Sequence, residues 1–356
     1  MKAFSQDMLS LENVCALHLQ PDKRNLLSVL KGECPKRPTL FELFLNDRIY
    51  WDVTQDLQYD PNDPYARQKR IVDACCRLGY DCVSLYGARV RFPVRKVDKH
   101  GASSVSQNVI TIGDRDDFEA YQWPDVDTAD FVRMDAIGKH LPDGMGYIVY
   151  GPGGVEETLV ELVGYENLCY MLADEPELVE EIVEAIGTRL VRYYEICAAN
   201  PYVDALIYND DWGFNTQTLL PPRTLRALVF PWVNRIVDVI KVNGKPVILH
   251  SCGNILKVME DIITDMRFDA KHSYQDSILP VEEFYERYHD RIAVLGGMDV
   301  DFIIRSKPEQ VYARACAMLE RVKNRGGYAL GSGNSIPEYV PTEQYLAMAA
   351  AATFNR

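Results

Sequence analysis

Short apolar runs alternate along the chain with longer segments in which apolar residues recur at helical spacing. Runs of apolar and β-branched residues are typical of buried strands, whereas apolar residues three or four positions apart are typical of helices. The sequence predicts eight strands, at 39–45, 81–86, 145–150, 204–208, 246–250, 268–272, 292–296 and 327–331. Helices are expected at about 63–78, 155–172, 175–198, 222–242 and 308–323, with a last helix over the alanine-rich C-terminal segment.

Eight strands, most of them followed by a helix, are the count of a (β/α)8 TIM barrel. Parallel strands that are buried on both faces read as nearly continuous apolar runs, and most of these strands do. A doubly wound sheet usually has a Gly-rich turn after its first strand, but Asn46-Asp47-Arg48 stands there. We therefore expect an α/β protein with one TIM-barrel domain over residues 1–356. It includes an N-terminal helical extension at 1–37, with a helix near 21–31. It also includes an insertion after strand 2, at 88–125, in which 109–112 is a candidate hairpin strand.

The composition and charge of the chain argue against a nucleic-acid-binding or membrane-spanning protein. The chain has 38 Lys and Arg against 52 Asp and Glu, a net charge of −14, and an acidic chain without a basic block is a poor nucleic-acid binder. No stretch reaches the roughly 18 apolar residues of a membrane span, and the N-terminus has no apolar signal core. Nine cysteines in such a chain are typical of reduced thiols. We expect a cytoplasmic protein that binds neither nucleic acid nor membranes.

Polar side chains gather where the predicted strands end, and the active site of a TIM barrel lies at the C-terminal ends of its strands. The segments concerned are 46–48, 209–211, 250–254, 272–276, 297–299 and 332–335. The sequence therefore predicts a site at this end of the barrel.

The sharpest local signal is His250-x-Cys252, at the end of the fifth predicted strand. An imidazole nitrogen and a thiolate suit a zinc ion, which needs at least three protein ligands. Asp210, Asp211 and His272 are candidates for the third ligand, and their spacing does not choose among them. The alternative is that His250 is a hydrogen-bonded core residue and Cys252 an apolar filler.

Asp210 and Asp211 are a second signal, because paired carboxylates at a strand end can hold a substrate or act as acid and base. The alternative for one of them is a helix cap or a solvated loop charge. Arg48 is a candidate for a bidentate contact to a substrate carboxylate, or else an ion-pair partner of Asp47 or Asp52. The segment 151–154, Gly-Pro-Gly-Gly, lacks the Lys and Ser/Thr of a phosphate loop, so a tight strand-to-helix turn is expected there.

Six segments together resemble the uroporphyrinogen decarboxylase superfamily of TIM barrels, over about residues 20–353. They are 41–44 (Phe-Glu-Leu-Phe), 151–154, 210–211 with 221–232, 247–254 (Val-Ile-Leu-His-Ser-Cys-Gly-Asn), 295–299 (Leu-Gly-Gly-Met-Asp) and 330–337 (Leu-Gly-Ser-Gly-Asn-Ser-Ile-Pro). The superfamily includes the haem-pathway decarboxylases and the cobamide-dependent methyltransferases.

The same segments favour the methyltransferase branch. The haem-pathway decarboxylases have a Met-Arg-Gln-Ala-Gly-Arg-Tyr signature after the first strand, whose arginines bind substrate carboxylates, and a His in the eighth strand. Here Arg48 is the one candidate for such an arginine, and Ser332 stands in the place of the His. The methyltransferases bind zinc with His-x-Cys at strand five and a Cys at strand eight. His250 and Cys252 match the first pair, while Ser332 replaces the last Cys. Either the third ligand is therefore a carboxylate or His272, or the metal site is weak or absent.

The resemblance implies transfer of a methyl group between a small substrate and a corrinoid (cobalamin) carried on a partner protein, assisted by zinc. It implies that His250 and Cys252 bind the metal and that Asp210 or Asp211 orients the substrate or relays a proton. Arg48, Gln275, Ser332 and Asn334 would then bind the substrate, and a homodimer is an open expectation. Two alternatives remain at this point: metal-free decarboxylation of uroporphyrinogen or a related tetrapyrrole, and a non-catalytic corrinoid- or tetrapyrrole-binding protein.

Overall fold

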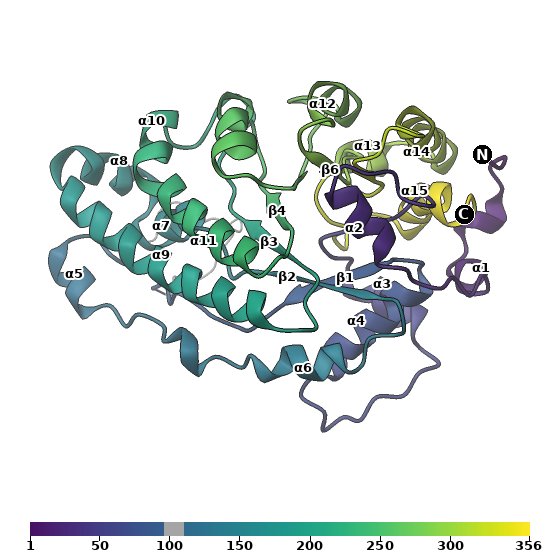
Figure 1. The fold of residues 1–356 in the computed structure, drawn as a ribbon, viewed down its shortest axis with the longest axis horizontal. Helices are drawn as coiled ribbons and strands as arrows, with labels where there is room; N and C mark the ends of the chain where they lie inside the picture. Colours follow the sequence, from purple (N-terminus) through teal and green to yellow (C-terminus); the bar gives the residue numbers. More distant parts are fainter. Residues whose placement is uncertain (96–109) are drawn as a thin grey trace.

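A curled sheet of seven parallel strands, in chain order, forms the centre of the molecule (Figure 1). The computed structural model describes residues 1–95 and 110–356. The strands are β1 (Cys82–Tyr86), β2 (Gly146–Tyr150), β3 (Ala205–Asn209), β4 (Val247–His250), β5 (Ala270–His272), β6 (Ala293–Leu295) and β7 (Tyr328–Ala329). They coincide with seven of the eight predicted strands, which confirms that continuous apolar runs mark strands covered on both faces.

The segment around Leu40 takes the eighth position and closes the (β/α)8 barrel. Phe41 N–H donates to the Leu330 carbonyl at 2.8 Å, and Leu330 N–H donates to the Thr39 carbonyl at 2.9 Å. On the other side, the Ser84 hydroxyl of β1 donates to the Glu42 carbonyl at 3.3 Å. The expected strand 39–45 is reduced to isolated bridges, because its neighbour β7 spans two residues and offers no continuous ladder.

Helices surround the sheet and fill most of the connections between strands (Figure 1). The N-terminal part of the chain contains η1 (Gln6–Leu9), α1 (Leu11–Cys15), α2 (Arg24–Leu30), α3 (Asp47–Val53) and α4 (Ala66–Arg77). Between β1 and β3 lie α5 (Arg115–Ala120), η2 (Val126–Thr128), α6 (Val132–Gly138), α7 (Val155–Val163), α8 (Tyr165–Asp174) and α9 (Pro176–Ala199). The remainder are α10 (Pro222–Thr224), the π-helical turn η3 (Leu225–Val229), α11 (Phe230–Val242), η4 (Leu256–Val258), η5 (Asp261–Asp265), α12 (Val281–Tyr288), α13 (Val300–Arg305), α14 (Pro308–Val322) and α15 (Thr342–Thr353).

Two local expectations are corrected, and a helix start at Asn46 is added. The expected helix 155–172 is divided at Gly164, whose φ of 79° ends α7 before α8 begins. Asn46-Asp47-Arg48 opens α3, because the Asn46 side chain accepts the N–H of Ile49 at 3.1 Å and caps the helix. Of the candidate hairpin strand 109–112, Val109 lies outside the described residues. The other three positions form no strand, and the N–H groups of Thr111 and Ile112 donate instead to the Leu162 carbonyl of α7.

The N-terminal extension closes the far end of the barrel. Leu26, Val29 and Leu30 of α2 belong to the same apolar cluster as the residues at the N-terminal ends of the strands. Small side chains at these strand ends leave room for the helix; they are Cys82, Ala205, Ala270, Ala293 and Ala329. Lys23 pairs with Asp204 at 2.7 Å and fixes the helix there. The C-terminal ends of the strands are therefore the end at which a ligand can approach the barrel interior.

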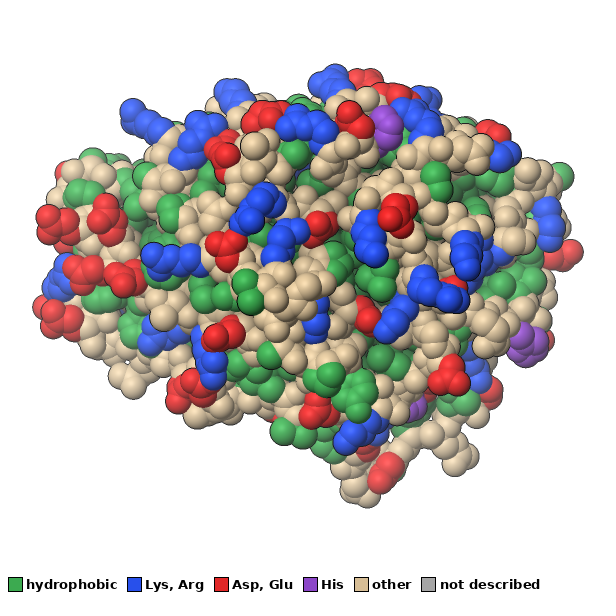
Figure 2. Space-filling view, viewed as in Figure 1, with side chains coloured by type: hydrophobic (Ala, Val, Ile, Leu, Met, Phe, Trp, Pro, Cys, Tyr) green, Lys and Arg blue, Asp and Glu red, His purple; other side chains and the backbone are tan. Residues whose placement is uncertain are grey.

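The two chain termini lie on the same side of the molecule, where α15 packs against α14 and against η1 (Figure 1). Figure 2 shows acidic and basic side chains interspersed over the displayed face. Among the described residues, none of the helices combines the length and the apolar character that crossing a bilayer requires.

Candidate metal centre

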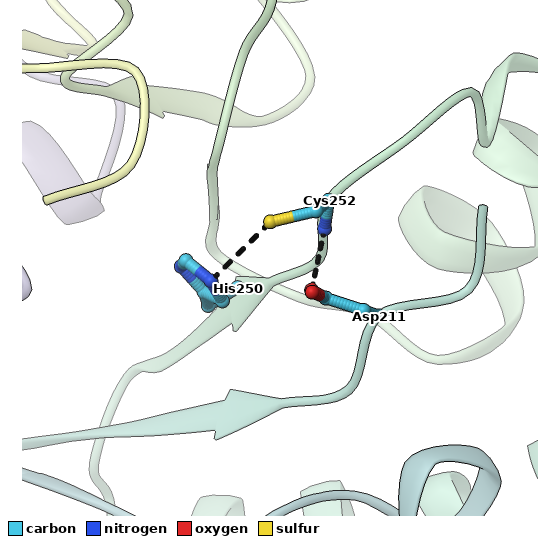
Figure 3. A group of neighbouring side chains, drawn as sticks. All are labelled: Asp211, His250 and Cys252. Carbon is cyan, nitrogen blue, oxygen red and sulfur yellow. Dashed lines mark hydrogen bonds between the residues drawn. The ribbon is translucent and has the colours of Figure 1, made fainter. Parts of the chain in front are cut away.

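The C-terminal ends of β3 and β4 bring together Asp211, His250 and Cys252 (Figure 3). Their ligand atoms lie within 4.8 Å of one another, and His250 Nε2 is 3.7 Å from Cys252 Sγ. In a tetrahedral zinc site with bonds of about 2.05 Å to nitrogen and about 2.3 Å to sulfur, these two atoms are about 3.6 Å apart. The spacing of the nitrogen and sulfur donors therefore fits a zinc ion.

The two loops that carry these side chains are held against each other by hydrogen bonds and by a close backbone approach. Asp210 N–H donates to the His250 carbonyl at 3.0 Å, and Cys252 N–H donates to Asp211 Oδ1 at 2.8 Å. Gly253 has a φ of 81°, and a Cβ there would overlap the carbonyl oxygen of Gly213. Glycine after Cys252 is thus required both by the backbone conformation and by the approach of the two loops.

His272 of β5 fixes the orientation of the His250 ring. The two Nδ1 atoms are 2.8 Å apart, so one donates to the other, and the Nε2 of His250 is left on the side of Cys252. Burial lowers the pKa of both rings, that of His250 to about 4, which keeps the imidazole in the neutral form that binds metals. Metal-binding histidines usually have such a partner on the second nitrogen. His272 is therefore placed behind His250, and of the three residues proposed as the third ligand it is Asp211 that joins the cluster.

Two side chains point hydrogen-bond donors at the Cys252 sulfur. Ser273 Oγ lies 3.2 Å from Sγ, and Asn334 Nδ2 lies 3.3 Å from it. Burial and the neighbouring Asp211 carboxylate raise the pKa of the thiol, so the sulfur keeps its proton at neutral pH unless a cation displaces it. A nitrogen, a sulfur and an oxygen donor form a set typical of zinc and atypical of magnesium or calcium.

Asp210 points away from this cluster, so the two neighbouring carboxylates do not act as a pair. Its carboxylate accepts the N–H groups of Glu156 and Glu157 at 3.1 and 2.8 Å and the Tyr208 hydroxyl at 2.7 Å. It therefore caps α7, which is the alternative that the sequence left open for one of the two residues. A Cβ at Gly154 would overlap this carboxylate, which explains the last glycine of the turn 151–154. The expected strand-to-helix turn is confirmed, and the chain's own carboxylate fills the position that an anion would take at the helix N-terminus.

Ser332 is engaged by a carboxylate rather than by the metal ligands. Its backbone N–H donates to Glu42 Oε1 at 2.6 Å, and its hydroxyl shares a 2.6 Å hydrogen bond with Oε2. Burial raises the pKa of Glu42 to about 8. Asn334, two residues beyond Ser332, makes the contact to Cys252 in its place. The residue at the usual strand-eight position thus takes part in a buried pair that the sequence did not reveal.

Of the other expected substrate-binding residues, Arg48 lies apart, whereas Gln275 and Asn334 lie together. Arg48 lies on α3 with 78% of its side chain exposed, 3.6 Å from Asp52, so the ion pair is the alternative that the structure shows. Gln275 is exposed in the loop after β5, and together with Asn334 it lines a cavity of about 700 Å³ at the ends of β5 to β7.

A second cavity, of about 590 Å³, lies at the ends of β1 and β2 and was not expected. Arginines from three different segments line it: Arg67 of α4, Arg89 and Arg91 after β1, and Arg133 of α6. Only the spacing Arg89-x-Arg91 directly after a predicted strand signals this site in the sequence.

Comparison with known proteins adds the family. A sequence profile of the family described as uroporphyrinogen decarboxylase (URO-D) matches residues 146–353, more than half of the chain. The chain belongs to the uroporphyrinogen decarboxylase family. This confirms the expected superfamily, and the barrel agrees with it.

A solved methyltransferase structure shows the same fold. A methyltransferase from Methanosarcina mazei is similar with a TM-score of 0.67 and 16% identity, over 93% of this chain and 97% of that one. A Listeria monocytogenes structure named for a vitamin-B12-independent methionine synthase has a TM-score of 0.49 and 11% identity, over 94% and 98% of the two chains. A search of curated proteins finds no match.

Proposed function

We propose that this protein is a zinc-assisted methyltransferase that moves a methyl group between a small substrate and a corrinoid carried on a partner protein. The observation that carries the proposal is the convergence of Asp211, His250 and Cys252 at the open end of the barrel. The methyltransferase activity named for the Methanosarcina mazei protein of the same fold supports it.

In this proposal three protein ligands hold the metal and leave its fourth position to a reactant, as in catalytic zinc sites. Asp211 takes the role of the strand-eight cysteine of the methyltransferases, because this chain has Ser332 at that position. His272 keeps the His250 ring in place, and the donors of Ser273 and Asn334 stabilise the deprotonated sulfur of Cys252. A zinc ion bound there would act as a Lewis acid on the heteroatom that carries or accepts the methyl group.

The residues assigned to tetrapyrrole decarboxylation are less favourably placed. That alternative uses Arg48 as an anchor for carboxylates, but Arg48 faces solvent beside Asp52. It also uses Asp210 or Asp211 to stabilise a protonated pyrrole. Asp210 is already saturated by the N-terminus of α7 and by Tyr208, and Asp211 lies in the cluster with His250 and Cys252. We therefore favour methyl transfer.

The decisive measurement is the zinc content of protein expressed in zinc-supplemented medium. We expect about one zinc per chain in the wild type and loss of the metal in Cys252→Ala, His250→Ala and Asp211→Asn. Cys169→Ser, which changes an exposed thiol on α8, is the matched control and should keep the metal. Retention of zinc by Asp211→Asn alone would remove Asp211 from the ligand set. Absence of zinc from the wild type would refute the zinc mechanism and favour the metal-free or the binding-protein alternative.

Activity is tested separately, with cob(I)alamin as methyl acceptor and a panel of methylated thiols, amines and ethers as donors. Methylation of the cobalt changes the visible spectrum, and we expect a change that Cys252→Ala abolishes and Cys169→Ser does not.

A further inference from the structure

The cavity at the ends of β1 and β2 carries an excess of positive charge in a protein whose net charge is −14. Four arginines line it, and Arg67 is neutralised by Asp47 at 2.6 Å. Arg89, Arg91 and Arg133 form no ion pair with any residue of 1–95 or 110–356. Glu157 and Glu161 of α7 lie close enough to Tyr86, which lines the cavity, for their charges to raise the pKa of its hydroxyl.

Two polar atoms of the lining lack a partner within the described part of the chain. Arg133 Nε and Gln68 Oε1 are both buried without a hydrogen bond. A buried polar group that stays unpaired is destabilising, and more so if it is charged. The guanidinium fork matches a carboxylate in a bidentate contact, so an anionic ligand would satisfy Arg133 and neutralise its neighbours.

The rest of the lining is apolar and aromatic. The rings of Tyr86 and Tyr150 lie 4.2 Å apart at 54° and form one wall, and Phe44, Ile71 and Val90 contribute apolar surface. Arg67 and Arg133 lie close enough to Tyr150 for their charges to lower the pKa of its hydroxyl, against the larger effect of burial. A cavity of about 590 Å³ is of the size that holds small organic ligands.

We propose that this cavity binds an organic carboxylate, with its carboxylate on Arg133 and the pair Arg89 and Arg91, and its apolar body against Tyr86 and Tyr150. Inorganic phosphate has the charge but no body to use the aromatic wall, so an organic acid is favoured. The strand order places this cavity beside the sector of the barrel that carries the Asp211–His250–Cys252 cluster. That the carboxylate belongs to the methyl-transfer substrate rests on the proposed function, whereas the binding itself does not.

The experiment is isothermal titration at low ionic strength with benzoate and benzene-1,3,5-tricarboxylate, with their amides as neutral counterparts and with inorganic phosphate. We expect the carboxylates to bind at least about tenfold more tightly than the amides and than phosphate, and to weaken with added salt. Arg133→Gln and the double variant Arg89→Gln/Arg91→Gln should each weaken carboxylate binding at least about tenfold. Arg223→Gln is the matched control, because Arg223 lines a different cavity, and it should bind as the wild type does.

Arg89 and Arg91 are exposed, so their double variant still decides the matter if Arg133→Gln does not fold. No binding of either carboxylate, equal binding of the amides, unchanged binding in the folded arginine variants, or phosphate binding as tight as benzoate would each overturn the proposal. Cys252→Ala separates the two proposals, because it should lose zinc and retain carboxylate binding.

Discussion

His272 holds the Nδ1 of His250 at 2.8 Å and thereby leaves the Nε2 of His250 to face the sulfur of Cys252. His272 itself contributes no ligand atom to the cluster. This relationship predicts that His272 affects metal binding indirectly, by orienting His250.

Replacing His272 by Ala should weaken zinc binding about 10- to 100-fold, the usual effect of losing the hydrogen bond behind a ligating histidine. Competition with a chromogenic chelator measures this affinity. His272→Asn keeps a polar group at the position and should recover part of the loss. An unchanged zinc affinity in His272→Ala, with the fold intact by circular dichroism, would contradict the assigned role.

The pH dependence of zinc binding should show that one proton is released when the metal binds. The pKa of His250 is lowered to about 4, so this ring is already neutral above pH 5, whereas the raised pKa of Cys252 means that its thiol must lose a proton to the metal. The apparent zinc affinity should therefore rise about tenfold for each pH unit between about pH 5.5 and 8. A rise of about a hundredfold per unit would mean that two protons leave and that His250 is protonated in the metal-free protein.

Glu42 should make stability depend on pH in the sense opposite to an ion-paired carboxylate. Its pKa is raised from 4.5 to about 8 by burial, so the folded state holds a proton that the unfolded state has lost. The resulting stabilisation is complete below about pH 4.5 and disappears as the pH rises to about 8, with a slope of up to about 1.4 kcal/mol per pH unit. Urea unfolding of the wild type and Glu42→Gln from pH 5 to 8 measures it. The difference in unfolding free energy between the two should change with pH in this direction, and a constant difference would argue against a protonated Glu42.

Ser332→Cys should not strengthen zinc binding, because in the proposed site Asp211 completes the set of three ligands and the Ser332 side chain is turned to Glu42. We expect the variant to lose about 1–3 kcal/mol of unfolding free energy, since a thiol replaces the hydroxyl that pairs with the buried carboxyl group. Metal content and denaturant unfolding of the same preparation give both values. A marked gain in zinc affinity would show instead that the strand-eight position still faces the metal.

The barrel and two of the three residues of the candidate metal cluster follow from local sequence. Strands such as 246–250 are recognisable because burial on both faces requires a continuous apolar run, and the polar residues that follow such a run stand at the open end of a barrel. His250 and Cys252 are two positions apart on one strand end, so their proximity needs no knowledge of the rest of the chain.

The rest of the candidate site depends on contacts between residues that are far apart in the sequence or on the path of a loop, and sequence spacing does not predict these. Asp210 and Asp211 are adjacent, and which of them reaches the cluster is decided by the path of the chain as it leaves β3. Glu42 and Ser332 are 290 positions apart and meet because the first segment closes the barrel beside β7. The arginine cavity joins α4, the segment after β1 and α6, and helical and loop arginines of this kind read in the sequence as solvated surface charges.

Helix α2 packs across the N-terminal ends of the strands, so in the described part of the chain the barrel interior is approached from the C-terminal ends. Under the proposed function, the small substrate and the bulky protein that carries the corrinoid must therefore use the same opening in turn. Once the carrier docks, the substrate can neither enter nor leave past it. The small substrate must then bind before the carrier protein. An excess of carrier protein should inhibit turnover, because the carrier would bind to enzyme that holds no substrate.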